Sequence, residues 1–226
     1  YLPDAIVNFL ALLGWAPNSD QEIFSREELI QQFSLDHVAK NPAVFDIKKL
    51  NWLNAHYMRQ LSDEDYVAFA VPFMKEAGYM TGEETGEKLE WLKKVILTAR
   101  DQAEFGKEIP EKVALYFTDE FDFETPEAEA VLKEETVPQV MGLFLDKLAA
   151  AEGLDHAATK ALFKAVQKET KLGGKKVFMP VRVALTGNQH GPELAEMIPL
   201  LGKDRVASRI RGSLAKAGVN LSLIHI

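Results

Sequence analysis

Apolar residues recur at helical spacing along nearly the whole chain, and this periodicity limits the fold more than any other feature. Ile47, Leu50 and Leu53, for example, are three residues apart and therefore lie on one face of a helix. Helix-starting residues precede several such stretches, and Ser25 and Glu28 have the spacing of a capping box. Stretches that alternate apolar and polar residues, as half-buried strands do, are few. We therefore predict an all-α, mainly helical fold.

Three positions bear on where individual helices end. Pro72 lies inside an expected helix and should kink or shorten it, because proline lacks the backbone N–H. The segment 88–105 is expected to be one long helix, since its apolar residues keep helical spacing throughout. Gly173 is expected to stop the helix that precedes it, because glycine readily adopts the left-handed conformation of a helix end.

The stretch PVRVALTGNQHGPEL, residues 180–194, allows two interpretations. Its β-branched valines are typical of a buried strand ending in a turn, whereas Phe178, Val181 and Leu185 also fit one face of a helix. Arg182 interrupts the apolar run, and a polar, glycine-bounded loop follows. That arrangement also suits an arginine directed at a ligand beside a loop whose backbone touches the same ligand.

Polar or proline-containing joints near 60–63 and 134–138 suggest how the helices are grouped. They predict three helical modules, 1–61, 62–137 and 138–220, followed by an apolar tail at 221–226 that we interpret as foreign to the natural chain. The first residue is Tyr1 and not Met, so we expect the chain to be a piece of a longer protein.

Composition excludes several classes of protein. The 226 residues are 47% apolar, enough for a real core, but no apolar run approaches the roughly 18 residues that a membrane span needs. There is no cysteine, so disulfides and thiolate metal sites are impossible, which suits a cytoplasmic protein. The five histidines are scattered without paired spacing, and we therefore predict no metal site.

Charge is distributed unevenly along the chain. The net charge is −8, but residues 1–159 hold 14 Lys/Arg and 30 Asp/Glu, whereas residues 160–226 hold 12 Lys/Arg and 4 Asp/Glu. The two parts therefore carry net charges of −16 and +8. Phosphate binding depends on a local basic face and not on the total. The same distribution is also compatible with an ordinary solvated helical surface.

No short motif points to catalysis. GxSxG, CxxC, HExxH and P-loop patterns are absent, and the acidic segment 118–125 is interpreted as a solvated loop in preference to an acid–base pair. On residues alone the chain is typical of a binding module without its own active site.

Three passages together resemble the bacterial glutamyl-tRNA synthetase family. They are YLPDAIVNFLALLGW at the start, residues 22–61, and FMPVRVALTGNQHGPELAEMIPLLGKDRV near the end. The order of elements matches throughout, although residues 80–140 match more weakly. The resemblance implies the end of the stem-contact region followed by two all-helical anticodon-binding subdomains, with helix, loop, helix across 180–194.

The resemblance also implies which residues read the anticodon. Arg182 matches the family's pocket arginine, and the GPEL loop supplies Gly191, Pro192 and Leu194. Gly191 would permit close approach of the backbone, while Pro192 and Leu194 would offer backbone groups and apolar contact to a base. Arg100 matches a second arginine, which reads the third anticodon base and separates tRNA(Glu) from tRNA(Gln).

Other cations are candidates for phosphate contacts. They are Lys203, Arg205, Arg209, Arg211 and Lys216 near Arg182, and Lys48, Lys49 and Arg59 on the side expected to face the tRNA stem. Each also has a purely structural interpretation, as a solvated cation on a helix surface. For Arg182 that alternative is a bond to helix-end carbonyls or a pair with Glu193 or Glu196.

The function implied by the resemblance is tRNA binding. The intact family enzyme ligates glutamate to tRNA(Glu) using ATP and magnesium, but neither its HxGH nor its KMSKS motif is present in this sequence. We therefore expect a non-catalytic fragment that binds no cofactor itself, recognises tRNA(Glu), does not bind DNA or a membrane, and is a cytoplasmic monomer. Two alternatives stay open: a non-discriminating enzyme that also accepts tRNA(Gln), and a helical protein-interaction scaffold.

Overall fold

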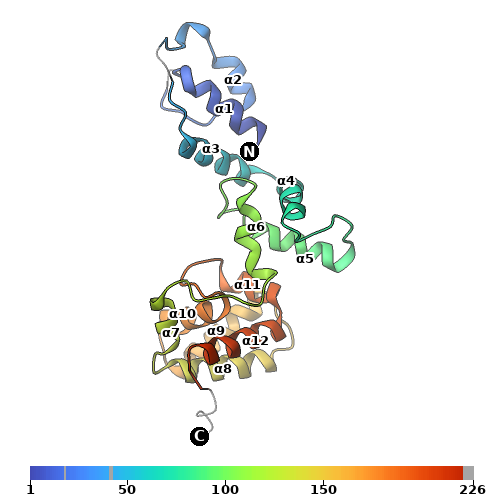
Figure 1. The fold of residues 1–226 in the computed structure, drawn as a ribbon, viewed down its shortest axis with the longest axis vertical. Helices are drawn as coiled ribbons and strands as arrows, with labels where there is room; N and C mark the ends of the chain where they lie inside the picture. The colour runs from blue at the N-terminus through green and yellow to red at the C-terminus, as the bar shows by residue number, and fades with distance from the viewer. Residues whose placement is uncertain (18, 41–42, 221–226) are drawn as a thin grey trace. The chain divides into compact units, whose positions relative to one another are not determined.

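The computed structural model describes residues 1–17, 19–40 and 43–220, and these residues are mainly helical (Figure 1). Within them, the only extended pairing is an isolated antiparallel bridge between Trp15 and Val38. The prediction of an all-α fold is confirmed. The tail at 221–226 that we interpreted as foreign lies outside the described residues.

The chain divides into two compact units, Tyr1–Ala114 and Leu115–Ile226. The first contains α1 (Pro3–Gly14), α2 (Arg26–Gln32), η1 (Leu35–His37), α3 (Ile47–Gln60), α4 (Asp63–Glu76), α5 (Gly86–Leu97) and α6 (Glu108–Val113). After the 3₁₀ turn η2 (Ala114–Tyr116), the second contains α7 (Pro126–Leu132), α8 (Val137–Ala150), α9 (His156–Thr170), α10 (Gly174–Thr186), α11 (Leu194–Leu201) and α12 (Lys203–Lys216). The division into modules 1–61, 62–137 and 138–220 stays a prediction. Helix α7, which belongs to the predicted module 62–137, packs on α10 in the second unit.

In the first unit, a buried asparagine joins α1 to the segment that enters α2. The Asn8 side chain accepts a hydrogen bond from the Phe24 backbone N–H at 2.8 Å and donates one to the Glu22 carbonyl at 3.0 Å. The predicted capping box is present: Ser25 Oγ accepts from the Glu28 N–H, and the Glu28 carboxylate accepts from the Ser25 N–H. That backbone hydrogen bond stabilises the charged form and lowers the pKa of Glu28.

One expectation about a helix end in the first unit was wrong. α5 stops at Leu97 and does not run to residue 105: the Thr98 hydroxyl donates to the Val95 carbonyl, and the backbone tightens into three-residue turns. α4 is not shortened at Pro72 and continues to Glu76, so a kink at Pro72 stays a prediction.

In the second unit, α10 is the central helix, since it packs against α7, α8, α9 and α12 (Figure 1). It is a helix and not a strand, with Val177, Val181 and Ala184 fully buried. The preceding helix ends at Lys171, which itself adopts the left-handed conformation at φ 57°, so the expectation that Gly173 stops it was wrong by two residues. Gly173 is instead the N-cap residue that immediately precedes α10.

The acidic segment is an exposed loop, as expected, but two of its carboxylates also pair with cations of α12. Asp119 accepts from Arg205, and Asp122 accepts from Lys216. The hydrogen bond from Arg205 is the main reason why the pKa of Asp119 lies below its usual value. The Glu124 N–H also donates to the Gly187 carbonyl at 3.1 Å, so the segment is attached to the end of α10.

Gly187 and Gly218 provide a matched test of that attachment. Both have φ 74°, but an added Cβ at 187 would collide with the Asp122 carbonyl oxygen, whereas one at 218 would meet nothing within 4 Å. We expect Gly218→Ala to lower the free energy of unfolding by about 1–2 kcal/mol through backbone strain. Gly187→Ala should lose a further ~1–3 kcal/mol through overpacking. Urea denaturation followed by circular dichroism measures both, and equal losses would show that the Asp122 contact does not constrain α10.

Candidate nucleic-acid interface

Arg182 lies on α10 and is held against the loop that follows this helix. Its Nη1 donates to the Pro192 carbonyl at 2.7 Å. Partial burial lowers the pKa of the guanidinium, which nevertheless stays a cation at neutral pH. Arg182 thus bonds a loop carbonyl and not the carbonyl of a helix end, and this bond brings it beside the GPEL loop. Glu193 pairs instead with Lys160, at 3.2 Å.

The GPEL loop approaches the guanidinium through its backbone. Gly191 has φ 144°, a conformation that favours glycine, and a Cβ there would lie 3.4 Å from Arg182 Nη1. Pro192 is half-buried and supplies the carbonyl. Leu194 is only 3% exposed, so its side chain belongs to the core in this conformation. What the loop offers beside Arg182 is therefore main chain and the half-buried Pro192, with the exposed Glu193 next to them.

Two residues that the sequence did not single out support the loop. The Thr186 hydroxyl donates to the Arg182 carbonyl at 2.9 Å and accepts from the Asn188 N–H at 3.1 Å. Asn188 Oδ1 is buried and has no hydrogen-bond partner in the part of the chain that the structure describes. A threonine and an asparagine flanking a helix-ending glycine are the signal that would have pointed to them.

Arg100 lies in the first unit, on the turn after α5 and not within a helix. Its Nη2 donates to Asp63 Oδ1 at 2.8 Å, and its guanidinium carbon is 5.0 Å from the centre of the Tyr66 ring. Arg100 Nε is buried without a partner among the described residues. The solvated-helix interpretation was therefore wrong: the side chain is positioned by an aromatic ring and a carboxylate.

Most of the other candidate cations contact the protein itself. Arg209 is 4% exposed and donates to the carbonyls of Leu185 and Leu115, at 3.0 and 2.6 Å, and to that of Thr118. Arg205 bonds Asp119 and the Tyr116 carbonyl, and Lys203 bonds the Ala151 carbonyl. These contacts favour structural roles for the α12 cations.

The cations expected on the stem side also differ in their surroundings. Lys49 pairs with Glu22, and Arg59 Nε lies 3.7 Å from Asp101. Lys48 is exposed in the first turn of α3. Lys48 and Arg59 are thus exposed, whereas Lys49 is half-buried.

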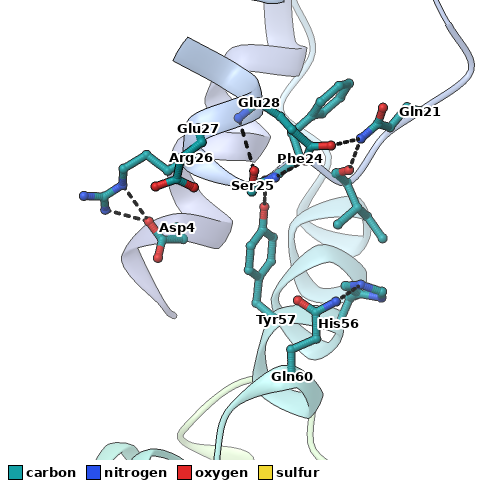
Figure 2. Close-up of a pocket in the computed structure, with 11 residues that line it drawn as sticks. Asp4, Gln21, Phe24, Ser25, Arg26, Glu27, Glu28, His56, Tyr57 and Gln60 are labelled. Carbon is teal, nitrogen blue, oxygen red and sulfur yellow. Dashed lines mark hydrogen bonds and ion pairs between the residues drawn. The ribbon is translucent and has the colours of Figure 1, made fainter. Parts of the chain in front are cut away.

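The first unit also contains a polar cavity of about 770 Å³ between α1, α2 and α3 (Figure 2). Figure 2 shows Arg26 directed at Asp4, to which it is bonded at 2.6 Å, and Tyr57 directed at the main chain near Ser25. Asp4, Glu27 and Glu28 outnumber Arg26 among the charged lining residues. This excess of carboxylates repels phosphate and makes the cavity unsuitable for RNA.

Within the described residues, no helix is long and apolar enough to cross a membrane. The same residues contain no group of three or more histidine and carboxylate side chains placed to hold a metal ion.

Two family models match different parts of this chain. Residues 65–214 match the family described as the anticodon binding domain, and residues 1–52 match the catalytic domain of class I tRNA synthetases (E and Q). The chain is 46% identical over 214 residues to the glutamate–tRNA ligase of Desulforamulus reducens, covering 95% of this chain and 44% of that protein. It is 43% identical to the glutamate–tRNA ligase of Bacillus subtilis, covering 93% and 44%.

Solved structures give the same relationship. A glutamate tRNA ligase from Elizabethkingia meningosepticum, crystallised in complex with its amino acid, has a TM-score of 0.81 at 28% identity. The match covers 96% of this chain and 42% of that one. The chain thus spans less than half the length of the relatives it matches. Since the anticodon binding domain model matches more than half of its residues, the chain belongs to the anticodon binding domain family.

Proposed function

We propose that this chain is the tRNA-recognition part of a glutamyl-tRNA synthetase and that it reads the anticodon of tRNA(Glu) at Arg182. The observation that carries this proposal is the 2.7 Å bond between Arg182 and the Pro192 carbonyl, beside a loop whose Gly191 backbone lies close to the same guanidinium. A guanidinium and an approachable backbone thus lie together on a half-buried surface.

This arrangement suits recognition of an unstacked base. Single-stranded RNA loops are read by planar side chains that stack on bases and by donors that reach base edges. The bond to Pro192 fixes the orientation of Arg182 through one of its five N–H donors. A planar, permanently charged group held in this way loses little conformational entropy when it binds a base.

Arg100 is proposed as the second reading residue, for the third anticodon base. Its support is geometric: the guanidinium is fixed by Asp63 and lies over the Tyr66 ring. A fixed donor discriminates bases better than a mobile one, because a wrong base then leaves a buried donor unpaired. The parent enzyme would on this account discriminate against tRNA(Gln).

The activity of the whole protein is part of the same proposal. The intact enzyme would ligate glutamate to tRNA(Glu) with ATP and magnesium, as a cytoplasmic monomer. The chain contains neither an HxGH nor a KMSKS motif, so the residues that would bind ATP lie outside this sequence. In this chain we assign RNA binding and no catalytic step.

Arg182→Ala should weaken binding to tRNA(Glu) by about 1–3 kcal/mol, the usual effect of losing a base-specific contact. Binding to a tRNA changed only in its anticodon should hardly alter, so the ratio of the two affinities falls. Fluorescence anisotropy with both RNAs at two salt concentrations measures this ratio.

Arg182→Lys is the matched control, since it keeps the charge but loses the planar fork. We expect it to retain the salt dependence of wild type while losing most of the anticodon preference. Equal binding of the wild-type chain to both RNAs would contradict the assignment, and loss of helical circular dichroism in both variants would favour a structural role for Arg182.

Asp63→Asn should reduce discrimination at the third anticodon base, because Arg100 loses the carboxylate that orients it. The measurement is the affinity for tRNA(Glu) relative to the same RNA carrying the third base of tRNA(Gln). Arg59→Gln is a suitable control, since its ion pair with Asp101 is long and exposed. If Asp63→Asn and Arg100→Ala both keep the wild-type ratio, neither residue reads that base.

A further inference from the structure

On α12, Arg205, Arg209 and Lys216 bond the protein's own loop, whereas Arg211 is exposed. A larger group of exposed cations lies where α9 meets α10. Five exposed lysines cluster there in sequence: Lys164, Lys168, Lys171, Lys175 and Lys176. The nearby Glu169 is paired with Lys147, which leaves this corner strongly basic. A surface of this kind attracts phosphates.

One face of α10 connects this corner to the proposed anticodon pocket. Lys175, Phe178 and Arg182 are spaced i, i+3 and i+7, so they lie along the same side of the helix. With a rise of about 1.5 Å per residue, Lys175 and Arg182 are roughly 10 Å apart along the axis. That span is suited to a short run of nucleotides following the helix.

Phe178 is unusual among the large apolar residues of the second unit because 39% of its surface is exposed. It is nevertheless fixed, since its ring lies 4.5 Å from that of buried Phe163 at an interplanar angle of 34°. Gly174, one turn earlier, has no side chain, and an added Cβ would touch the Phe178 ring at 3.5 Å. The ring is thus supported from the core and left uncovered on the helix surface.

We propose that Phe178 is a stacking platform for an RNA base and that Lys175 and its neighbours bind the adjoining phosphates. Together they extend the RNA site from Arg182 toward the start of α10. The inference rests on the proposed function, because it takes the nucleotides next to the one bound at Arg182 as its ligand. Proteins that bind single-stranded nucleic acid without reading its sequence combine aromatic rings, on which bases stack, with cations that contact the backbone.

The test uses the chain with a tRNA(Glu) transcript in which 2-aminopurine replaces one anticodon-loop base at a time. Stacking on Phe178 should quench the probe at one position in the wild-type complex. Phe178→Leu, which keeps an apolar side chain against Phe163, should abolish that quench and weaken binding roughly 5- to 150-fold. Phe178→Tyr should retain both, because its ring still stacks.

The lysines are tested by salt dependence. Lys175→Gln should lower the slope of log K against log salt by about one phosphate contact. Lys216→Gln removes the same charge from a site already paired with Asp122 and should leave the slope unchanged. Equal slopes for the two variants would overturn the phosphate assignment.

The stacking proposal fails if Phe178→Leu binds as wild type with an unchanged quench, or if Phe178→Tyr loses as much affinity as Phe178→Leu. If Arg182→Ala still abolishes anticodon preference in that case, the proposed function stands and only this extension is wrong. A wild-type chain that shows no preference for the tRNA(Glu) anticodon overturns both.

Discussion

The second unit depends on one buried guanidinium. Arg209 sits almost without exposure between α12, the end of α10 and the segment that follows η2, and its donors reach carbonyls of Leu185, Leu115 and Thr118. Burying a cation is costly unless its donors are matched, and removal of such a partner leaves carbonyls unpaired in the core. Burial accordingly lowers the pKa of Arg209. This cation joins three parts of the chain that are distant in sequence.

The same region determines where the proposed RNA pocket lies. The Ser213 hydroxyl donates to the Ala184 carbonyl at 2.7 Å, and the Glu124 N–H bonds the Gly187 carbonyl. The last turn of α10 is thereby fixed from two sides. Arg182 lies one turn before this end, and the GPEL loop begins just after it. Both are therefore positioned by contacts within the protein. The proposed site is therefore held in place by the protein itself, which would reduce the entropic cost of binding RNA.

Much of this could be predicted from the sequence. Helical spacing predicted the all-α fold, the Ser25–Glu28 capping box is present, and the resemblance correctly placed Arg182 beside the GPEL loop. What the local pattern could not predict are contacts between distant segments. The α12 cations looked available for phosphate because nothing local shows that the acidic segment, some 90 residues earlier, would bind them. At the end of α5 the Thr98 hydroxyl donates to the Val95 carbonyl. One threonine changes the spacing of apolar residues too little to predict that the helix stops there.

The central claim is that the anticodon lies against α10 and the loop after it. Photo-cross-linking tests this directly, with 4-thiouridine placed within the anticodon of tRNA(Glu) and the cross-linked peptide identified by mass spectrometry. The account predicts cross-links to residues between Lys175 and Leu194. Cross-links confined to α12, or equal labelling by an RNA with the thiouridine outside the anticodon loop, would contradict it.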